Sequence, residues 1–332
     1  MPGETGRIER NPCLLAIEMG KVGCSERVLE ALRDDQVRVK VEVSLVSTGT
    51  ELHHIMGTHT KPFTYPGSTG YISVGRIEGF GSKVENWKLG ERVLVQQSHF
   101  ARHNANPNQM LRVPEGVDPV DAATAILLGI SLRGVRGGQV RLGDSVLVVG
   151  LGVIGQYAVH LAKVAGAHPV IAVDLVAKRR EIARELGADV ALDPKSCDVK
   201  AEVLKATHGE GAFVTMDASG TPKVIATLPD YTAAFGRVVV LGGVHGSVPF
   251  DLYTRFQKSN LTMVGCGSHY PGDYPFDKPQ RNEAVLLQMI ASGQVRPRPA
   301  ITHVVPWREG PEMYRMLIEE KEKVVGVAFR WE

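Results

Sequence analysis

The chain has 332 residues, enough for two domains of ordinary size, and its apolar (43%) and charged (22%) fractions are those of a soluble globular protein. A formal net charge of +2 without a dense basic run argues against nucleic acid or a membrane surface as a partner. The polar first residues, MPGETGRIERNP, lack the apolar core of a signal peptide, and no apolar run is long enough to cross a bilayer. The four cysteines (Cys13, Cys24, Cys197 and Cys266) have no C-x-x-C spacing, so we expect a reduced, cytoplasmic setting.

The first third of the chain predicts short strands separated by glycine and proline. The predicted strands cover residues 12–17, 37–46, 72–77 and 91–96. The clearest is VRVKVEVSLV at 37–46, where apolar residues alternate with polar ones. The stretch SHFARHNANPNQ that follows the fourth strand is polar and predicts a loop. This part of the chain therefore predicts a small β-rich domain.

From residue 120 the pattern changes to alternating strands and helices. After a helix at 122–135, strands are predicted at 145–149, 169–173, 189–192, 213–217, 237–241 and 261–265, and helices at 153–166, 177–186, 198–207 and 222–235. Six parallel strands with crossover helices form a doubly wound sheet.

The C-terminal part changes character again. It predicts a helix at 282–291, a strand at 301–305, a helix at 309–320 and a strand at 324–329. The simplest arrangement returns this part to the β-rich domain. We therefore expect a discontinuous first domain (1–120 and 267–332) with an α/β domain (121–266) inserted in it.

The α/β domain begins with the signature of a dinucleotide-binding unit, DSVLVVGLGVIGQYAVHLAKVAGAHPVIAVD. Gly150 permits a tight turn, Gly152 leaves room for a pyrophosphate, and Gly155 lets the helix pack close to its strand. The helix N-terminus offers unpaired N–H groups to that anion. The residues expected at the pyrophosphate are Gly150, Gly152, Val153, Ile154 and Gly155.

The second strand of this unit ends in Asp174, 19 residues after Gly155. A carboxylate there can accept hydrogen bonds from the adenosine ribose and would repel a 2′-phosphate, which favours NAD over NADP. Lys178, Arg179 and Arg180 follow and weaken this preference; the alternative interpretation is a solvated first helical turn. Lys178 is expected beside Asp174 at the ribose.

The order of these parts resembles the medium-chain dehydrogenase/reductase superfamily over essentially the whole chain. The resemblance rests on STGTELHHIMG (47–57), GYISVGRIEGFG (70–81), LGDSVLVVGLGVIG (142–155) and LGG (241–243). It implies a GroES-like β-rich catalytic domain and a six-stranded Rossmann domain. The Ser-Thr-Gly-Thr-Glu run is also similar to that of the bacteriochlorophyllide dehydrogenase branch and related secondary-metabolite dehydrogenases, which oxidise a secondary alcohol.

The zinc-binding members of this superfamily carry ligands that are missing here. Thr48 stands where they have cysteine, Tyr71 where they have histidine, and Ile72 where they have glutamate; the third ligand would fall near Thr124 or Ala125. A catalytic Zn²⁺ ion needs three Cys, His or carboxylate ligands and an open position. The cysteines of the structural zinc lobe are absent as well. We therefore predict a zinc-free member.

A rebuilt metal site is the alternative. The candidate ligands are His53, His54, His59, His99 and His103. Because asparagine and proline surround His103, a loop end is favoured over a helix that would align it with His99. We expect these histidines to be hydrogen-bonded or solvent-facing.

Without zinc, a side chain must accept the alcohol proton during oxidation and return it during reduction. Tyr71 is the first candidate, with pocket lining as its alternative role. The resemblance implies that His53 relays the proton from Thr50 and the ribose to solvent, although a structural hydrogen bond to the ribose is also consistent. Thr48 and Thr50 are expected at the substrate oxygen, or as plain helix caps. Glu51 replaces the family's aspartate and is expected to orient its neighbours.

The resemblance also supplies the remaining contacts. The backbone of Gly242, Val244 and Ser268 is expected at the nicotinamide carboxamide, and Asp217 as a strand-end acid near the cofactor. Gln96, His99, His269 and Tyr270 are expected to line the substrate pocket. Because these side chains are polar, we expect a hydroxyl-rich or amine-bearing substrate such as a sugar, cyclitol or decorated natural product.

Three functions remain open at this point. The first is an NAD-dependent, zinc-independent secondary-alcohol dehydrogenase. The second is an NADP-dependent reductase of an activated double bond or quinone, against which Asp174 argues. The third is a non-catalytic NAD-binding protein. The apolar strand from Leu261 to Cys266 is expected at the sheet edge, where superfamily members pair, so we predict a homodimer.

Overall fold

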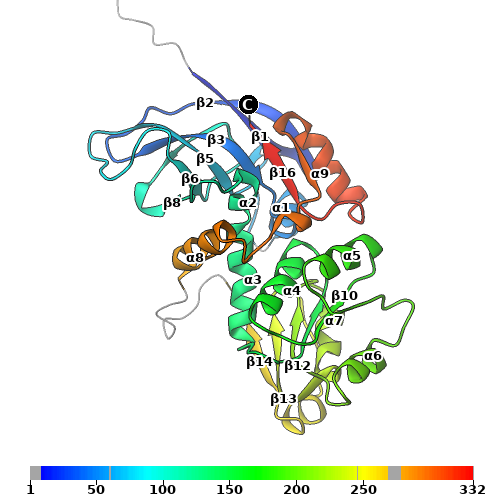
Figure 1. Ribbon diagram of the computed structural model, residues 1–332. Helices are drawn as coiled ribbons and strands as arrows, with labels where there is room; N and C mark the ends of the chain where they lie inside the picture. The colour runs from blue at the N-terminus through cyan, green and yellow to red at the C-terminus, as the bar shows by residue number, and fades with distance from the viewer. Residues whose placement is uncertain (1–8, 60, 245, 268–277, 332) are drawn as a thin grey trace, which may run out of the picture. The chain divides into compact units, whose positions relative to one another are not determined.

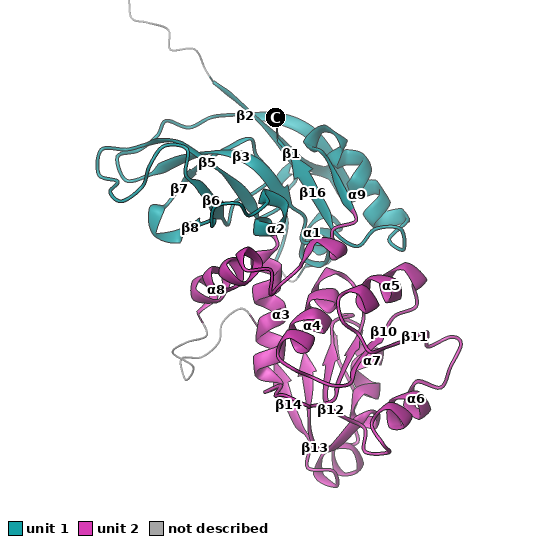
Figure 2. Cartoon of the chain, viewed as in Figure 1, with its two compact units in different colours: residues 1–123, 303–332 teal, residues 124–302 magenta. Residues whose placement is uncertain are grey.

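The structure, a computed structural model, describes residues 9–59, 61–244, 246–267 and 278–331. The chain forms two compact units (Figures 1 and 2). Unit 1 combines Met1–Ala123 with His303–Glu332, and unit 2 is Thr124–Thr302. The Rossmann-type unit is therefore inserted into the β-rich one.

Unit 1 contains two antiparallel-rich sheets. The smaller has the order β2-β1-β4, from β1 (Arg10–Glu18), β2 (Lys21–Val28) and β4 (Gly67–Ser68). The larger has the order β15-β16-β3-β5-β6-β8, with β7 paired to β3. Its strands are β3 (Val37–Leu45), β5 (Ser73–Phe80), β6 (Arg92–Val95), β7 (Arg102–Ala105), β8 (Leu111–Arg112), β15 (His303–Pro306) and β16 (Val327–Arg330). The alternation expected at 37–46 is confirmed, because Val37, Val39, Val41 and Val43 of β3 are buried.

The helices of unit 1 are α1 (Thr48–Ile55), α2 (Pro119–Ala123) and α9 (Gly310–Glu319) among the described residues. Helix α9 lies against β2, as Figure 1 shows near the red end of the chain. Its Tyr314 packs in one apolar cluster with Leu14, Ile55 and Phe329, all at most 1% exposed. Each fully buried side chain of this kind contributes roughly 1.5–3 kcal/mol to folding. The C-terminal segment is thereby fixed in the core of unit 1.

Unit 2 is a six-stranded parallel sheet of the order β11-β10-β9-β12-β13-β14. Its strands are β9 (Val146–Val149), β10 (Val170–Val173), β11 (Val190–Leu192), β12 (Ala212–Asp217), β13 (Thr232–Val240) and β14 (Thr262–Gly265). Its helices are α3 (Ala125–Gly137), α4 (Val153–Val164), α5 (Ala177–Glu185), α6 (Val199–Ala206), α7 (Pro222–Thr227) and α8 (Pro279–Ala291). Because crossovers are right-handed, the direction of winding reverses at β9 and β12. The predicted doubly wound α/β fold is confirmed.

Three local predictions were wrong. The helix expected at 122–135 is divided into α2 and α3 at Thr124. The helix expected at 222–235 ends early, because Pro229 lies in a short 3-10 turn and Thr232 pairs with Ala212 as the start of β13. The loop expected around SHFARHNANPNQ contains β7, whose His103 pairs with Val39.

The chain returns to unit 1 at His303, not at residue 267 as expected. Helix α8 packs against α3 within unit 2. The segment after α8 is held there too, since the Arg296 N–H donates to His160 Nε2 (2.9 Å) and the Tyr157 hydroxyl donates to the Pro297 carbonyl (3.4 Å). These contacts explain why 278–302 stays with the nucleotide-binding unit.

None of the helices that the structure describes is long and apolar enough to cross a membrane. The longest of them, α3 and α8, have 13 residues each.

Candidate active site and dinucleotide cradle

The glycine-rich turn after β9 has the geometry that its sequence predicts. Gly150 has a φ of +91°, and a Cβ there would lie 2.6 Å from the Ser219 nitrogen. A Cβ on Gly155 would lie 1.8 Å from the Gly150 carbonyl oxygen, so only glycine lets α4 approach this closely. A Cβ on Gly152 would meet no atom within 4 Å. The space beside the N-terminus of α4 is therefore open to an anion.

The turns after β12 and β13 complete the cradle at the point where the strand order reverses. A Cβ on Gly242 would lie 2.6 Å from the Gly220 nitrogen, so these turns touch through their main chains. Asp217, which is fully buried, accepts hydrogen bonds from the Ser219 hydroxyl (2.6 Å) and the Gly220 N–H (3.2 Å). Burial raises the pKa of its carboxyl group, against these hydrogen bonds, which lower it. We call the turns that follow β9, β12 and β13 the dinucleotide cradle, and their close-packed backbone fits a dinucleotide.

Asp174 lies beside the glycine-rich turn, at the end of β10. Its Oδ2 accepts the Leu151 N–H (2.7 Å) and its Oδ1 accepts the Val176 N–H (2.8 Å). Each carboxylate oxygen has a second lone pair for a ribose hydroxyl. The Arg179 guanidinium lies 3.8 Å from Oδ2. Lys178 is instead 64% exposed and 3.5 Å from Glu181, as in a solvated helical turn.

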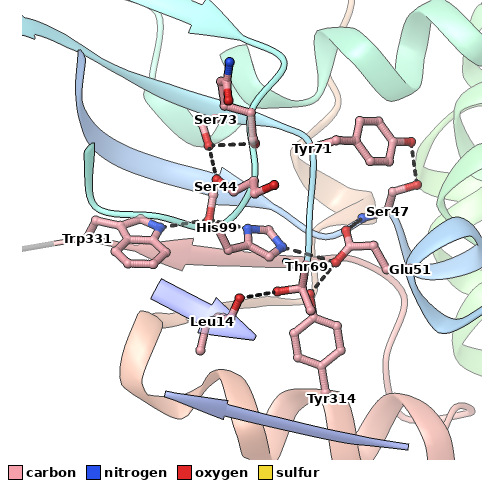
Figure 3. A network of polar contacts seen from close by, with 12 residues as sticks. Leu14, Ser44, Ser47, Glu51, Thr69, Tyr71, Ser73, His99, Tyr314 and Trp331 are labelled. Carbon is pink, nitrogen blue, oxygen red and sulfur yellow. Dashed lines mark hydrogen bonds and ion pairs between the residues drawn. The ribbon is translucent and has the colours of Figure 1, made fainter. Parts of the chain in front are cut away.

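A buried carboxylate marks the candidate catalytic region of unit 1. Glu51, on α1, is 3% exposed. Its Oε1 accepts the Ser47 N–H (2.7 Å), and its Oε2 accepts the Tyr314 hydroxyl of α9 (Figure 3). Burial, followed by the charge of Glu51, raises the pKa of Tyr314 well above its ordinary value. Tyr314 is therefore a neutral donor to Glu51.

His99 belongs to the same group of side chains and not to a substrate pocket, which corrects our expectation. It has no exposed surface, and its ring packs edge-on against Phe329 at 5.2 Å between centroids. Its Nδ1 lies 2.7 Å from Ser44 Oγ, which accepts the Trp331 indole N–H (2.8 Å). Its Nε2 lies 3.3 Å from Glu51 Oε2, a charge contact without hydrogen-bond geometry.

Tyr71 lies at the edge of this group. Its hydroxyl donates to Ser47 Oγ at 2.7 Å, and the side chain is half-buried (Figure 3). Ser47 is the N-cap residue of α1, but its hydroxyl makes no capping bond. It is therefore available to the phenol. We call Ser44, Ser47, Glu51, Tyr71, His99, Tyr314 and Trp331 the polar network.

The other predicted residues are placed as follows. Thr48 and Thr50 lie in the first turn of α1, where Thr48 is half-buried and Thr50 is exposed. His53 Nδ1 lies 2.8 Å from Thr58 Oγ1. Gln96 is exposed just after β6, and Val244 is half-buried. Ser268, His269 and Tyr270 lie outside the described residues.

Sequence analysis missed Ser44, Ser47, Tyr314 and Trp331. Tyr314 is 263 positions from Glu51, and Trp331 is 287 from Ser44, so only the folded chain brings them together. One signal was available for Ser47: a glutamate four residues after a serine at a helix start can reach back to its N–H, much as in a capping box.

A separate polar hollow of about 570 Å³ lies in unit 1 near Trp87. It is lined by none of the predicted site residues. Its charges are mixed, with Asp35 and Glu85 opposite in sign to Lys83 and Arg112. The Arg112 guanidinium covers the Trp87 ring at 4.0 Å, so the indole face is not free for a ligand.

Comparison with known proteins agrees with this architecture. The alcohol dehydrogenase GroES-like domain matches residues 33–166, and the zinc-binding dehydrogenase domain matches residues 153–277. D-guloside 3-dehydrogenase of Escherichia coli K12 is 33% identical over 270 residues, which cover 78% of this chain and 77% of that protein. L-galactonate-5-dehydrogenase of the same strain is 27% identical over 324 residues (89% and 92%). The fold matches 2R,3R-butanediol dehydrogenase from Bacillus subtilis with a TM-score of 0.84, at 19% identity and coverages of 96% and 99%.

A GroES-like unit that carries an inserted dinucleotide cradle defines a pyridine-nucleotide oxidoreductase. The chain belongs to the medium-chain dehydrogenase/reductase superfamily.

The residues present do not fit the zinc ion that the family name implies. Ile72 is a fully buried apolar side chain, and Tyr71 is engaged with Ser47. Among the residues that the structure describes, no group of three His, Cys, Asp or Glu side chains could hold a metal. The rings of His54 and His59 pair with 4.1 Å between their centroids, and burial, followed by the charge of His59, lowers the pKa of His54. Thr48, Thr124 and Ala125 offer no alternative donor set.

Proposed function

We propose that the protein is an NAD-dependent, zinc-independent dehydrogenase that oxidises a secondary alcohol of a hydroxyl-rich substrate, or reduces the corresponding ketone. The observation that carries this proposal is the Tyr71 phenol, which hydrogen-bonds Ser47 Oγ at 2.7 Å. The family resemblance implies that it stands where zinc-binding members have a histidine ligand. A positioned hydroxyl can perform the proton transfer that a Lewis-acid metal would otherwise assist.

The chain's own residues divide the work between binding and proton transfer. The cradle would hold the pyrophosphate at Gly152, and Asp174 would accept the ribose hydroxyls. When bound, the nicotinamide supplies the hydride acceptor in oxidation and the hydride donor in reduction. In ketone reduction Tyr71 would donate its proton to the substrate oxygen. In oxidation the phenol would first lose its proton towards solvent, with His53 as the route, and the phenolate, with Ser47 as its hydrogen-bond partner, would then take the alcohol proton.

Cofactor preference rests on Asp174. Its carboxylate would repel a 2′-phosphate, which supports NAD. The neighbouring Arg179, 3.8 Å away, favours NADP and with it the alternative of a double-bond or quinone reductase. The two named relatives act on D-guloside and L-galactonate, which supports a sugar-like alcohol as the substrate class.

The test is a substrate panel of polyols, sugars, sugar acids and enones, each assayed with NAD(H) and NADP(H). We expect oxidation of at least one polyol or sugar derivative by NAD. Reduction of enones by NADPH without alcohol oxidation would instead establish the reductase. NAD binding without turnover of any alcohol or ketone would establish the non-catalytic alternative.

We also propose that the protein is a homodimer through β14. This strand is the edge of the unit 2 sheet, and its Met263 is 40% exposed. An exposed apolar edge strand is a template for pairing with another copy. Met263→Lys should shift the mass measured by light scattering from dimer to monomer, whereas a monomeric wild-type protein would refute this proposal.

A further inference from the structure

The Glu51 carboxylate is buried, so the donors around it decide whether it is stable as an anion. Only 3% of Glu51 is exposed, and water cannot solvate it. A buried carboxylate is costly unless protein donors replace the lost water. The Ser47 N–H and the Tyr314 hydroxyl donate to it, and the ring of His99 lies 3.3 Å from Oε2. The site is thus built around one negative charge.

His99 connects the Glu51 carboxylate to the C-terminal end of the chain. The Trp331 indole N–H can only donate, so Ser44 Oγ accepts it. Ser44 Oγ also lies 2.7 Å from His99 Nδ1. The opposite ring nitrogen, Nε2, lies 3.3 Å from Glu51 Oε2. The imidazole is thus held between Ser44 and Glu51.

The opposite oxygen of Glu51 connects this charge to Tyr71. Oε1 holds the Ser47 N–H at 2.7 Å, which fixes the main chain at the start of α1. Ser47 is only 6% exposed, and its hydroxyl oxygen accepts a hydrogen bond from the Tyr71 phenol. An amide at position 51 has only one acceptor oxygen and would present NH₂ either to the Ser47 N–H or to the Tyr314 side. A glutamine that keeps the Ser47 N–H on its oxygen therefore turns its NH₂ to the Tyr314 hydroxyl, which must then accept and can no longer donate.

We propose that Glu51 is a positioning residue: its carboxylate, held by Tyr314 and His99, orients Ser47 and thereby aims the Tyr71 phenol at the reacting oxygen. This inference rests on the proton-transfer role proposed for Tyr71 above. The alternative is a helix cap that contributes only to stability. The positioning role predicts that a substitution at Glu51 changes the rate only while Tyr71 is present. The helix-cap role predicts the same effect with or without Tyr71.

A double-mutant cycle separates them. With NAD and the best alcohol of the panel, Glu51→Gln should lower kcat by about tenfold and leave the dissociation constant of NAD unchanged. In the Tyr71→Phe background the same substitution should change kcat by less than about twofold, because the hydroxyl that Glu51 is proposed to orient is absent. Equal effects in both backgrounds would overturn the inference while leaving the dehydrogenase function in place.

The matched control is Asn11→Ala. Asn11 is 4% exposed and its amide bonds both the N–H and the carbonyl of Arg102 in the same unit, outside the network. It should lower the unfolding temperature without changing kcat. If Glu51→Gln does not fold, Tyr314→Phe removes one donor with no change in side-chain charge and should give the same pattern with a smaller loss.

A second readout needs no turnover. In protein labelled with fluorotyrosine, the fluorine NMR resonance of Tyr71 is the one that disappears in the Tyr71→Phe variant. Glu51→Gln should shift that resonance and Asn11→Ala should not. An unmoved Tyr71 resonance in folded Glu51→Gln protein would refute the inference even if no alcohol is ever oxidised.

Discussion

The dinucleotide cradle of unit 2 is made of main-chain atoms, whereas the polar network of unit 1 is made of side chains from distant parts of the chain. Gly150, Gly152 and Gly155 shape the cradle within one turn, and Asp174 is held by N–H groups of Leu151 and Val176. In the network, a single contact can join residues 263 positions apart. Substitutions should therefore act by shape in unit 2 and by proton chemistry in unit 1.

The largest effect on stability is expected from Gly155→Ala, which tests the shape of the cradle. Its Cβ would lie 1.8 Å from a carbonyl oxygen, so strand and helix must separate. We expect a loss of about 3 kcal/mol in the free energy of unfolding, the upper end of the usual cost of overpacking, measured by urea denaturation.

Gly152→Ala is the matched control, because a Cβ there meets no atom within 4 Å. Its unfolding free energy should stay near that of the wild type, while NAD affinity, measured by calorimetry, falls. Equal stability of the two variants would contradict the account of the glycine-rich turn.

Tyr71→Phe tests the proton chemistry of unit 1. Removing a general acid or base costs about 10²–10⁴-fold in rate, so kcat should fall by that amount with little change in NAD binding. Tyr65→Phe is the control, since the Tyr65 hydroxyl donates to main-chain carbonyls, such as that of Ile55 at 2.8 Å, and lies outside the polar network. Wild-type turnover by Tyr71→Phe would show that the phenol only lines the site.

His103 adds a pH test of the packing in unit 1. Burial lowers its pKa to about 4, against about 6.5 in an unfolded chain. The folded state therefore resists protonation of His103. The contribution of His103 to the free energy of unfolding is constant above pH 6.5 and falls by roughly 2–3 kcal/mol as the pH decreases towards 4. His103→Asn should flatten this decline in urea titrations, whereas His168→Asn, at an exposed position, should not. A decline of unchanged slope in His103→Asn would point to other groups.

The smallest effect is expected from Asp174→Asn. Loss of the charge should change the ratio of NAD to NADP affinities by about tenfold in favour of NADP, because the carboxylate that repels a 2′-phosphate is gone. Lys178→Ala should leave the ratio unchanged, because that side chain points to Glu181 and solvent. An unchanged ratio in Asp174→Asn would remove the argument for NAD.

The parts that sequence analysis predicted correctly depend on neighbours in sequence. The six strands of unit 2 and the geometry of Gly150 and Gly155 follow from local patterns of apolar residues and glycine. The predicted end of the helix at 222–235 was wrong, because the pairing of Thr232 with Ala212 in the sheet outweighs the local helix propensity.

The network of unit 1 could not be predicted for the same reason. His99 lies in a polar stretch, which favoured an exposed loop, yet Ser44 and Glu51 enclose it. Tyr71 became a candidate only through the family resemblance, which implies a zinc ligand at its position. Its hydrogen bond to Ser47 Oγ is seen only in the folded structure.

The central claim is that the alcohol proton is handled by protein hydroxyl groups and not by zinc. The most direct test is the turnover of a panel substrate with NAD by protein purified with chelator, with the zinc content measured on the same sample. The account predicts full turnover at far less than one zinc per chain, with no gain on adding zinc. Activity that is lost with the chelator and returns in proportion to added zinc would contradict it.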